Sequence, residues 1–122
     1  MREAIEADND LRQRTKTFAL RIIRMYNALP AGQVAKVIGN QVLRSGSSVG
    51  ANYREAFRSR SDAEFIAKIG EILKELDETA YWLELLVESE VMPLEKLAAL
   101  LDETDQLIAI FTTIVKNKKK KG

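Results

Sequence analysis

The sequence predicts an all-α protein, folded as an antiparallel up-down-up-down four-helix bundle in a single domain spanning residues 1–122. Apolar residues recur at spacings of three and four along four long segments, as they do on one face of an amphipathic helix. No segment alternates apolar and polar residues as a strand does, and only 6 Gly and 2 Pro interrupt the chain. The helices are expected at about residues 11–29, 33–57, 61–90 and 93–116.

The first two helices are separated by a short turn after Pro30. The first helix is expected to begin near residues 9–10, where Asn or Asp can cap it, and to end before this proline. The second helix carries Gly46 and Gly50 one turn apart, each less favourable there than Ala by roughly 1 kcal/mol. Either these glycines let a neighbouring backbone approach closely, or the helix is kinked or loosened around residues 45–48.

The last two helices have clear boundary signals. Ser61 and Glu64 have the spacing of a capping box, which predicts the start of the third helix. Pro93 ends that helix and suits the first turn of the fourth. Residues 117–122, which include four consecutive lysines, are expected to form a flexible, frayed and solvated tail.

The charges are divided unevenly between the two halves of the chain. Residues 11–60 carry ten Lys or Arg and one acid, whereas residues 61–115 carry thirteen acids and three lysines. The formal net charge of +1 hides this division. The two halves can attract each other within or between chains, or the basic half can meet a polyanion.

The composition argues against an enzyme and against a metal or cofactor site. Cys and His are absent, which removes thiolate chemistry and the commonest general base and metal ligand. Glu71, Glu75 and Glu78 line one helical face, which is expected to be a solvated or ion-paired face because no Glu-x-x-His pattern accompanies it. The acidic residues 1–10 do not suit a signal peptide, and no apolar run reaches the length of a membrane span, so we expect a cytoplasmic protein that does not contact membranes.

A basic stripe follows the second helix. Arg44, Arg54 and Arg58 fall within about 80° of one another on a helical wheel, and Arg60 follows in the turn. Such a stripe can contact phosphates, or it can bind the acids of the third helix or of another subunit, and the sequence leaves both interpretations open. Three arginines of the first helix are expected to extend the basic surface: Arg12, Arg14 and Arg21.

Large apolar residues also occur on the acidic face of the third helix. Trp82 lies about 20° from Glu71 on the helical wheel, with Tyr81 and Leu85 beside it. Trp82 either covers the end of the intrachain core or marks a subunit interface, where aromatic residues are enriched. We therefore expect Tyr81, Trp82 and Leu85 at an oligomer interface, with the first alternative left open.

Two stretches, read together, indicate a family. Leu43–Ala56 and Tyr81–Leu86 closely resemble the bacterial four-helix-bundle proteins related to those encoded in intervening sequences of 23S ribosomal RNA genes. The resemblance covers roughly residues 11–115, and seven further residues contribute to it: Ser61, Phe65, Lys68, Lys74-Glu75 and Glu78-Thr79. It implies a homopentameric ring. The chain is also similar to the accessory variability proteins of diversity-generating retroelements, which implies comparable pentameric barrels that engage a reverse transcriptase and nucleic acid.

These observations favour a non-enzymatic homo-oligomer that associates with RNA, DNA or a nucleoprotein through the basic surface of its first two helices. Phosphate contacts carry little sequence information, so binding is expected to be weakly selective. The alternative is a protein–protein adaptor or scaffold whose basic helices pair with acidic subunits or partners. Neither hypothesis requires a catalytic residue.

Overall fold

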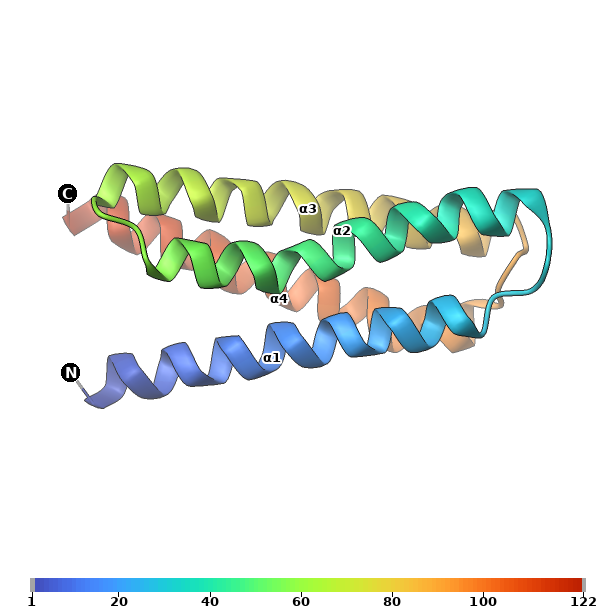
Figure 1. The fold of residues 1–122 in the computed structure, drawn as a ribbon, viewed down its shortest axis with the longest axis horizontal. Helices are drawn as coiled ribbons and strands as arrows, with labels where there is room; N and C mark the ends of the chain where they lie inside the picture. Colours follow the sequence, from blue (N-terminus) through green and yellow to red (C-terminus); the bar gives the residue numbers. More distant parts are fainter. Residues whose placement is uncertain (1, 122) are drawn as a thin grey trace.

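The computed structural model describes residues 2–121, without the side chains of residues 3–5 and 121. Its four helices are α1 (Arg2–Asn27), α2 (Gln33–Phe57), α3 (Asp62–Glu88) and α4 (Leu94–Lys121), and the described residues contain no strand. The helices run alternately up and down, so that both ends of the chain lie at the same end of an elongated bundle (Figure 1). The predicted all-α four-helix bundle is therefore confirmed.

Short connections with defined backbone chemistry join the helices. Gly32 precedes α2 with a φ of 140°, which a residue with a side chain rarely adopts. The side chain of Ser61 accepts a hydrogen bond of 3.1 Å from the backbone N–H of Glu64, as the capping signal predicted. After α3, Glu90 adopts a left-handed φ of 63°, and the chain returns so that the N–H of Met92 donates to the carbonyl of Leu86.

The amino-terminal end differs from the prediction, because α1 begins at Arg2 rather than near residues 9–10. Asp8, which precedes the expected start, is a buried side chain inside this helix. The hydroxyl of Tyr53 donates to Asp8 Oδ1 at 2.8 Å, and Arg12 Nε donates to Asp8 Oδ2 at 2.9 Å. This contact with α2 holds the first turns of α1 on the bundle, which the helix periodicity did not reveal.

The carboxy-terminal end also differs, since α4 continues through the lysine run to Lys121 instead of ending near residue 116. Lys118 Nζ lies 3.2 Å from Asp62 Oδ1 and 5.3 Å from the centre of the Phe65 ring. Lysine is a good helix former, and its charge is favourable at the negative end of the helix dipole. These contacts place residues 117–120 in an ordered helix rather than in a frayed tail.

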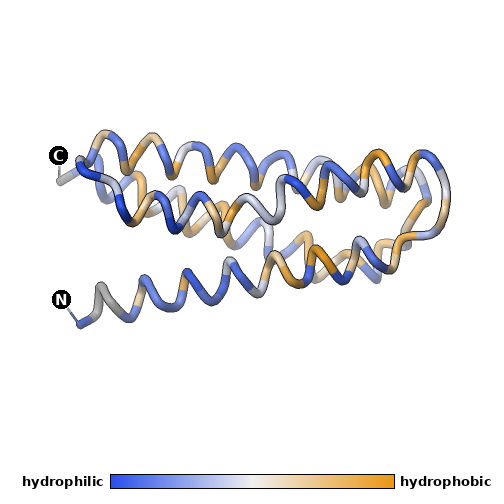
Figure 2. Tube along the Cα trace, viewed as in Figure 1, coloured by the Kyte–Doolittle hydropathy of each residue, from blue (hydrophilic) through white to orange (hydrophobic). Residues whose placement is uncertain are grey.

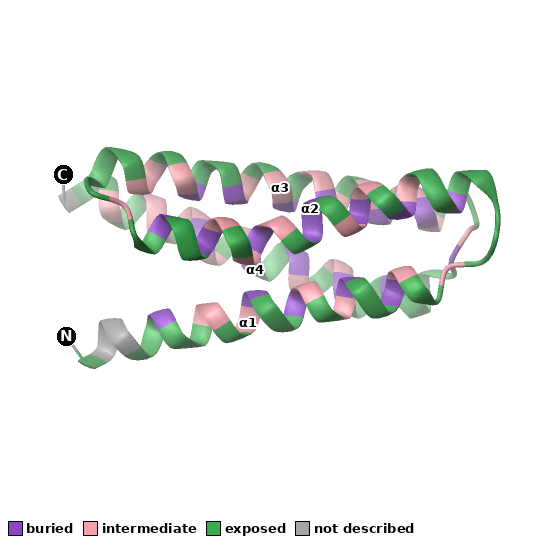
Figure 3. Cartoon of the chain, viewed as in Figure 1, coloured by how far each residue is buried: buried purple, intermediate pink, exposed green. Residues whose placement is uncertain are grey.

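The core runs along the whole bundle and draws on every helix, as the purple inward-facing segments of Figure 3 show. At the boundary between α2 and α3 the core also holds one polar contact, in which the hydroxyls of Ser45 and Thr79 lie 2.8 Å apart. None of the described helices combines the length and apolar composition that a membrane span requires. The largest fully buried side chains are Phe18, Ile22, Val42, Val49, Ile69, Ile72, Leu76, Leu83, Leu86, Leu97, Leu107 and Phe111.

Three glycines of α2 form a seam against α1. A Cβ atom built at Gly39 would lie 2.6 Å from Leu29 Cδ1, one at Gly46 would lie 2.8 Å from Ile22 Cγ1, and one at Gly50 would lie 3.3 Å from Thr15 Oγ1. The helix itself is continuous from Gln33 to Phe57. Close approach of a neighbouring helix, one of the two interpretations of these glycines, is therefore what their surroundings show.

Candidate nucleic-acid interface

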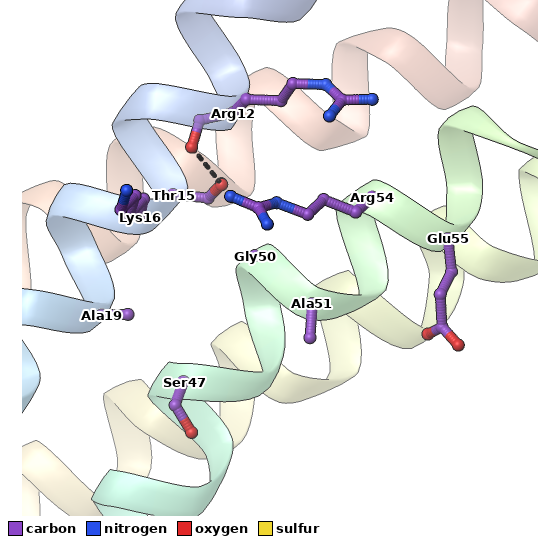
Figure 4. A pocket seen from close by; sticks show the side chains of 9 residues that line it. All are labelled: Arg12, Thr15, Lys16, Ala19, Ser47, Gly50, Ala51, Arg54 and Glu55. Carbon is purple, nitrogen blue, oxygen red and sulfur yellow. Dashed lines mark hydrogen bonds between the residues drawn. The ribbon is translucent and has the colours of Figure 1, made fainter.

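The outer edge of the glycine seam is an open groove between α1 and α2, with a volume of about 500 Å³. Its floor is made of small residues, among them Ala19, Gly50 and Ala51, because the two helices approach too closely for larger ones. Three cations line it, and Figure 4 shows the Arg54 side chain extending from α2 towards α1. These cations are Arg12, Lys16 and Arg54.

The groove is positive because its single acid is engaged elsewhere. Glu55 points away from Arg54 in Figure 4, and its Oε2 lies 3.7 Å from Lys68 Nζ on α3. Lys68 also donates to Glu71 at 3.4 Å. The pKa of Lys68 is raised, first by this hydrogen bond to Glu71 and then by the charge of Glu55. Lys68 thus attracts the acid of this face and leaves the charge of Arg54 unopposed.

The basic stripe predicted along α2 divides into two parts. Arg44 turns to α3, where its guanidinium lies 3.1 Å from Glu75 Oε2 and 3.5 Å from Glu78 Oε1. Arg54 and Arg58, in contrast, are exposed and form no ion pair with a described carboxylate. Arg44 therefore binds acids of the third helix, which was one of the two interpretations of the stripe. Phosphate binding remains a prediction for Arg54 and Arg58.

Arg60 lies apart from these residues, in the loop between α2 and α3. It lines a separate depression of about 290 Å³ at the end of the bundle, together with Ser59, Asp62 and Lys118. Its side chain is exposed and forms no ion pair with a described carboxylate. Arg60 therefore continues the positive surface beyond the end of α2 without joining the groove.

The three arginines predicted on the first helix have three different surroundings. Arg12 binds Asp8 and lies 5.5 Å from the centre of the Phe57 ring, so only part of its charge faces the groove. Arg14 lies on the opposite side of α1 and binds Glu103 on α4 through two hydrogen bonds of 2.8 Å. Arg21 also faces α4, where it lines a second groove. Only Arg12 of the three belongs to the surface between α1 and α2.

The contact of Arg14 with α4 is a well-formed ion pair. Its hydrogen bonds lower the pKa of Glu103 and raise that of Arg14, while the more distant charge of Arg21 lowers the pKa of Glu103 further. Arg14 Nη2 also donates to Gln106 Oε1 at 2.8 Å. This arginine thus makes its contacts within the bundle, away from the groove between α1 and α2.

The residues predicted at an oligomer interface lie near the carboxy-terminal end of α3. Tyr81 is exposed, and its ring meets that of Trp82 edge-on with centres 5.1 Å apart. Trp82 and Leu85 are half-buried. Trp82 packs against the core, as expected if it covers the end of the intrachain core. The Trp82 Nε1–H is shielded from solvent and has no acceptor among the described residues. The subunit interface itself remains a prediction.

Lys16 is the residue that sequence reasoning missed. It lies one turn after Arg12 on α1 and lines the groove opposite Arg54. The i, i+4 spacing of Arg12 and Lys16 was visible in the sequence. What the sequence did not indicate was that the glycine seam would bring this pair beside Arg54.

Comparison with known proteins agrees with the predicted resemblance. The family model described as "23S rRNA-intervening sequence protein" matches residues 7–113. A crystal structure described as a protein with unknown function from the S23 ribosomal protein family, from Bacteroides thetaiotaomicron, is 38% identical with a TM-score of 0.83, over 89% of this chain and 97% of that one. No curated protein matches the chain. From the match to the family model and the four-helix architecture, we conclude that the chain belongs to the family of 23S rRNA-intervening sequence proteins.

Proposed function

We propose that the protein is a non-enzymatic homo-oligomer, most simply a pentamer, that associates with nucleic acid through the groove between α1 and α2 and the adjoining end of α2. The observation that supports this best is the set of cations without a described ion-pair partner along that surface. Lys16 on α1 and Arg54 on α2 line the groove from its two sides, and Arg58 follows one turn after Arg54. The name of the family, which refers to 23S rRNA, makes RNA the first probe to use.

The groove suits a sugar–phosphate backbone more than it suits bases. It is shallow and floored by small residues, and no aromatic side chain lines it, so it offers guanidinium and ammonium donors without a stacking platform. Arginine can bind a phosphate through two parallel hydrogen bonds. Binding should therefore depend on charge and little on sequence.

Assembly would strengthen such weak contacts. A ring repeats the same groove around an axis, so that one strand can meet several copies. Tyr81 is exposed beside the acceptorless Trp82 Nε1–H, and the start of α2, which lies beside the end of α3 in Figure 1, exposes Val34 and Val37. A partner subunit on this surface would cover apolar area.

Nucleic-acid binding is tested by fluorescence anisotropy with labelled single-stranded RNA and duplex DNA at several salt concentrations. The affinity should fall with salt, with a slope near −0.9 per phosphate contact for duplex DNA and about −0.7 for single strands. Replacing Arg54 and Arg58 by Glu should weaken binding to all sequences alike and flatten the slope. The double variant Arg24→Glu/Lys96→Glu makes the same change in net charge on the other side of α1 and is the matched control.

The control should retain most of the affinity if the α1–α2 surface is the binding surface. Equal losses in the two double variants would mean that net charge alone matters. Absence of binding by the parent protein at low salt would contradict the proposed function. Sedimentation of each variant shows whether the oligomer survived, so that a loss of assembly is not mistaken for a loss of phosphate contacts.

Assembly is tested by sedimentation velocity on the parent and on Tyr81→Asp. Burying a carboxylate in the proposed interface is unfavourable, so the variant should dissociate into smaller species. Leu94→Asp is the matched control, because Leu94 has nearly the same exposure, 54% against 52% for Tyr81. A parent that is monomeric at micromolar concentration would contradict the proposed oligomer.

A further inference from the structure

The groove between α1 and α4 is lined by the least buried side chains of the core. Most core side chains are completely buried, and the three with the largest residual exposure are Met25 at 8%, Met92 at 7% and Leu100 at 5%. All three line this one groove, which has a volume of about 360 Å³. The exposed Ala28 and Ala99 complete its apolar lining.

The groove occupies the loop end of the seam between α1 and α4, the pair of neighbouring helices with the least contact. Nearer the middle of the bundle, Arg14 crosses the seam to Glu103 and Gln106 and holds the two helices together. Figure 2 shows that strongly apolar residues occur between hydrophilic ones in the carboxy-terminal half of α1, whereas its amino-terminal half is mostly hydrophilic. The open part of the seam is therefore also the part where α1 carries its apolar side chains.

The rim of the groove is basic. Arg21, Arg24 and Lys96 line it together with the apolar residues, and no acid lines it. None of these three cations forms an ion pair with a described carboxylate. An apolar floor with a purely cationic rim is complementary to an apolar stripe flanked by carboxylates.

We propose that this groove binds an acidic amphipathic helix of a partner protein, placed against α1 and α4 as an additional helix of the bundle. Such a helix inserts apolar side chains at spacings of three and four into a groove. Methionine is flexible and polarisable, which suits a floor that must adapt to the inserted side chains. Glu or Asp beside the apolar stripe would bind Arg24 and Lys96 at the rim.

The chemistry of the floor and the shape of the groove argue for this occupant over two others. A sugar–phosphate backbone gains nothing from a floor of methionine and leucine, so the site is distinct from the groove proposed for nucleic acid. An acyl chain is held in a pocket that encloses most of its surface, whereas this groove is open along the seam. The proposal does not depend on the nucleic-acid proposal.

The probe is a fluorescent peptide of about 16 residues, roughly 24 Å long as a helix, with Leu in an i, i+3, i+4 stripe and Glu at the remaining positions. Its anisotropy is measured with the full-length protein at about 0.15 M salt. A peptide with the same composition in scrambled order keeps the charge and loses the stripe, and a Lys-for-Glu peptide reverses the charge. We expect binding of the first peptide only.

Two kinds of variant locate the site. Ala99→Trp should fill the groove and abolish binding, while Ala98→Trp, at the exposed neighbouring position outside the groove, should leave it unchanged. Arg24→Glu/Lys96→Glu should weaken binding at least about tenfold, and Arg54→Glu/Arg58→Glu should not. If Ala99→Trp does not fold, as judged by circular dichroism, Ala28→Trp replaces it.

Five outcomes would overturn the proposal. Equal affinity for the scrambled peptide would reduce the effect to charge, and binding that survives both groove-filling changes would place it elsewhere. Displacement of the peptide by RNA would make a nucleic acid the occupant, and displacement by oleate would make a lipid the occupant. Loss of self-association in Ala99→Trp would make a second copy of the chain the occupant. Failure of RNA binding in the parent protein would leave the peptide result intact, so the two proposals can fail separately.

Discussion

The two seams of α1 differ in how their helices meet. Towards α2, the glycines Gly39, Gly46 and Gly50 let the two backbones approach closely. Leu29 and Ile22 of α1 fill the space that side chains at positions 39 and 46 would otherwise occupy. Towards α4 there is no such row of glycines, and much of the seam is held by the polar contact of Arg14 with Glu103. One helix therefore has a tightly packed seam and a loosely packed one.

This difference explains why the two grooves have different chemistry. Where the backbones nearly touch, only small residues fit, and the groove left outside them is rimmed by long cations on a floor of small residues. Where the helices stand apart, core residues such as Met25 and Met92 become the floor. The same basic helix thus offers a surface suited to phosphates on one side and one suited to apolar side chains on the other.

The strongest test of this comparison is to add the same side chain to both seams. Gly46→Leu should lower the free energy of unfolding by about 3 kcal/mol, because even its Cβ would lie 2.8 Å from the buried Ile22. Ala99→Leu in the open seam should change it by less than about 0.5 kcal/mol. Urea unfolding followed by circular dichroism measures both.

Gly70→Leu is the control for Gly46→Leu, since it replaces a helical glycine with open space around it. It should stabilise the protein by up to about 1 kcal/mol through helix propensity alone. If Gly46→Leu proved as harmless as Gly70→Leu, the tight packing of α1 on α2 would be wrong.

The contact of Tyr53 with Asp8 tests the tight seam at its amino-terminal end. Tyr53→Phe should cost about 2 kcal/mol, because it removes a hydrogen bond to a buried carboxylate. Hydrogen exchange at the first turns of α1 should increase in this variant more than elsewhere. Uniform protection along α1 would instead mean that other contacts hold this segment.

Tyr53 also predicts a loss of stability in alkali. Burial raises the pKa of Tyr53, and its hydrogen bond to Asp8 raises it further. A raised pKa in the folded state means that the neutral phenol stabilises the fold below the ordinary tyrosine pKa of about 10, and that this stability is lost as the pH rises above it. Tyr53→Phe should be less sensitive to pH over that range than the parent.

The ion pair between Arg14 and Glu103 tests the open seam and should have a smaller effect. Glu103→Gln should cost about 1 kcal/mol at neutral pH, because both side chains keep some contact with water. The pKa of Glu103 is lowered in the fold, so the pair stabilises the protein above the ordinary Glu pKa and loses this effect as the pH falls. The difference between variant and parent should therefore begin to shrink as the pH falls below roughly 4 and vanish only below the lowered pKa of Glu103.

The smallest effect is expected at Arg44, on the third seam, between α2 and α3. Arg44→Gln removes a half-exposed pair with Glu75 and should cost about 0.5 kcal/mol. It should leave RNA binding unchanged, in contrast to the Arg54→Glu/Arg58→Glu variant. A large loss of RNA affinity in Arg44→Gln would mean that the whole stripe binds phosphate.

Several features of the fold were predictable from single segments. The apolar periodicity of residues 33–57 predicted the bounds of α2, and Ser61 with Glu64 predicted the start of α3. The bounds that failed were those at the two ends of the chain. There the helices are extended by contacts with distant residues, Asp8 with Tyr53 and Lys118 with Asp62, which no local signal announces.

The candidate site was less predictable than the fold. A helical wheel placed Arg44, Arg54 and Arg58 on one face, yet Arg44 binds α3 and the other two do not. The wheel describes the directions of side chains around one helix. It cannot say which of them a neighbouring carboxylate reaches, because this depends on the rotation and offset of the neighbouring helix.

By itself, the sequence determined that the chain forms four amphipathic helices with short connections, with a basic first half and an acidic second half. These properties follow from periodicity, turn residues and composition, which belong to single segments. Only the tertiary structure decided that Gly39, Gly46 and Gly50 would face α1, that Lys16 would lie opposite Arg54, and that Met25 and Met92 would line an open seam. The reason is that helices pack through side chains distant in sequence, so the distance between two helices is set by the residues that meet across the seam.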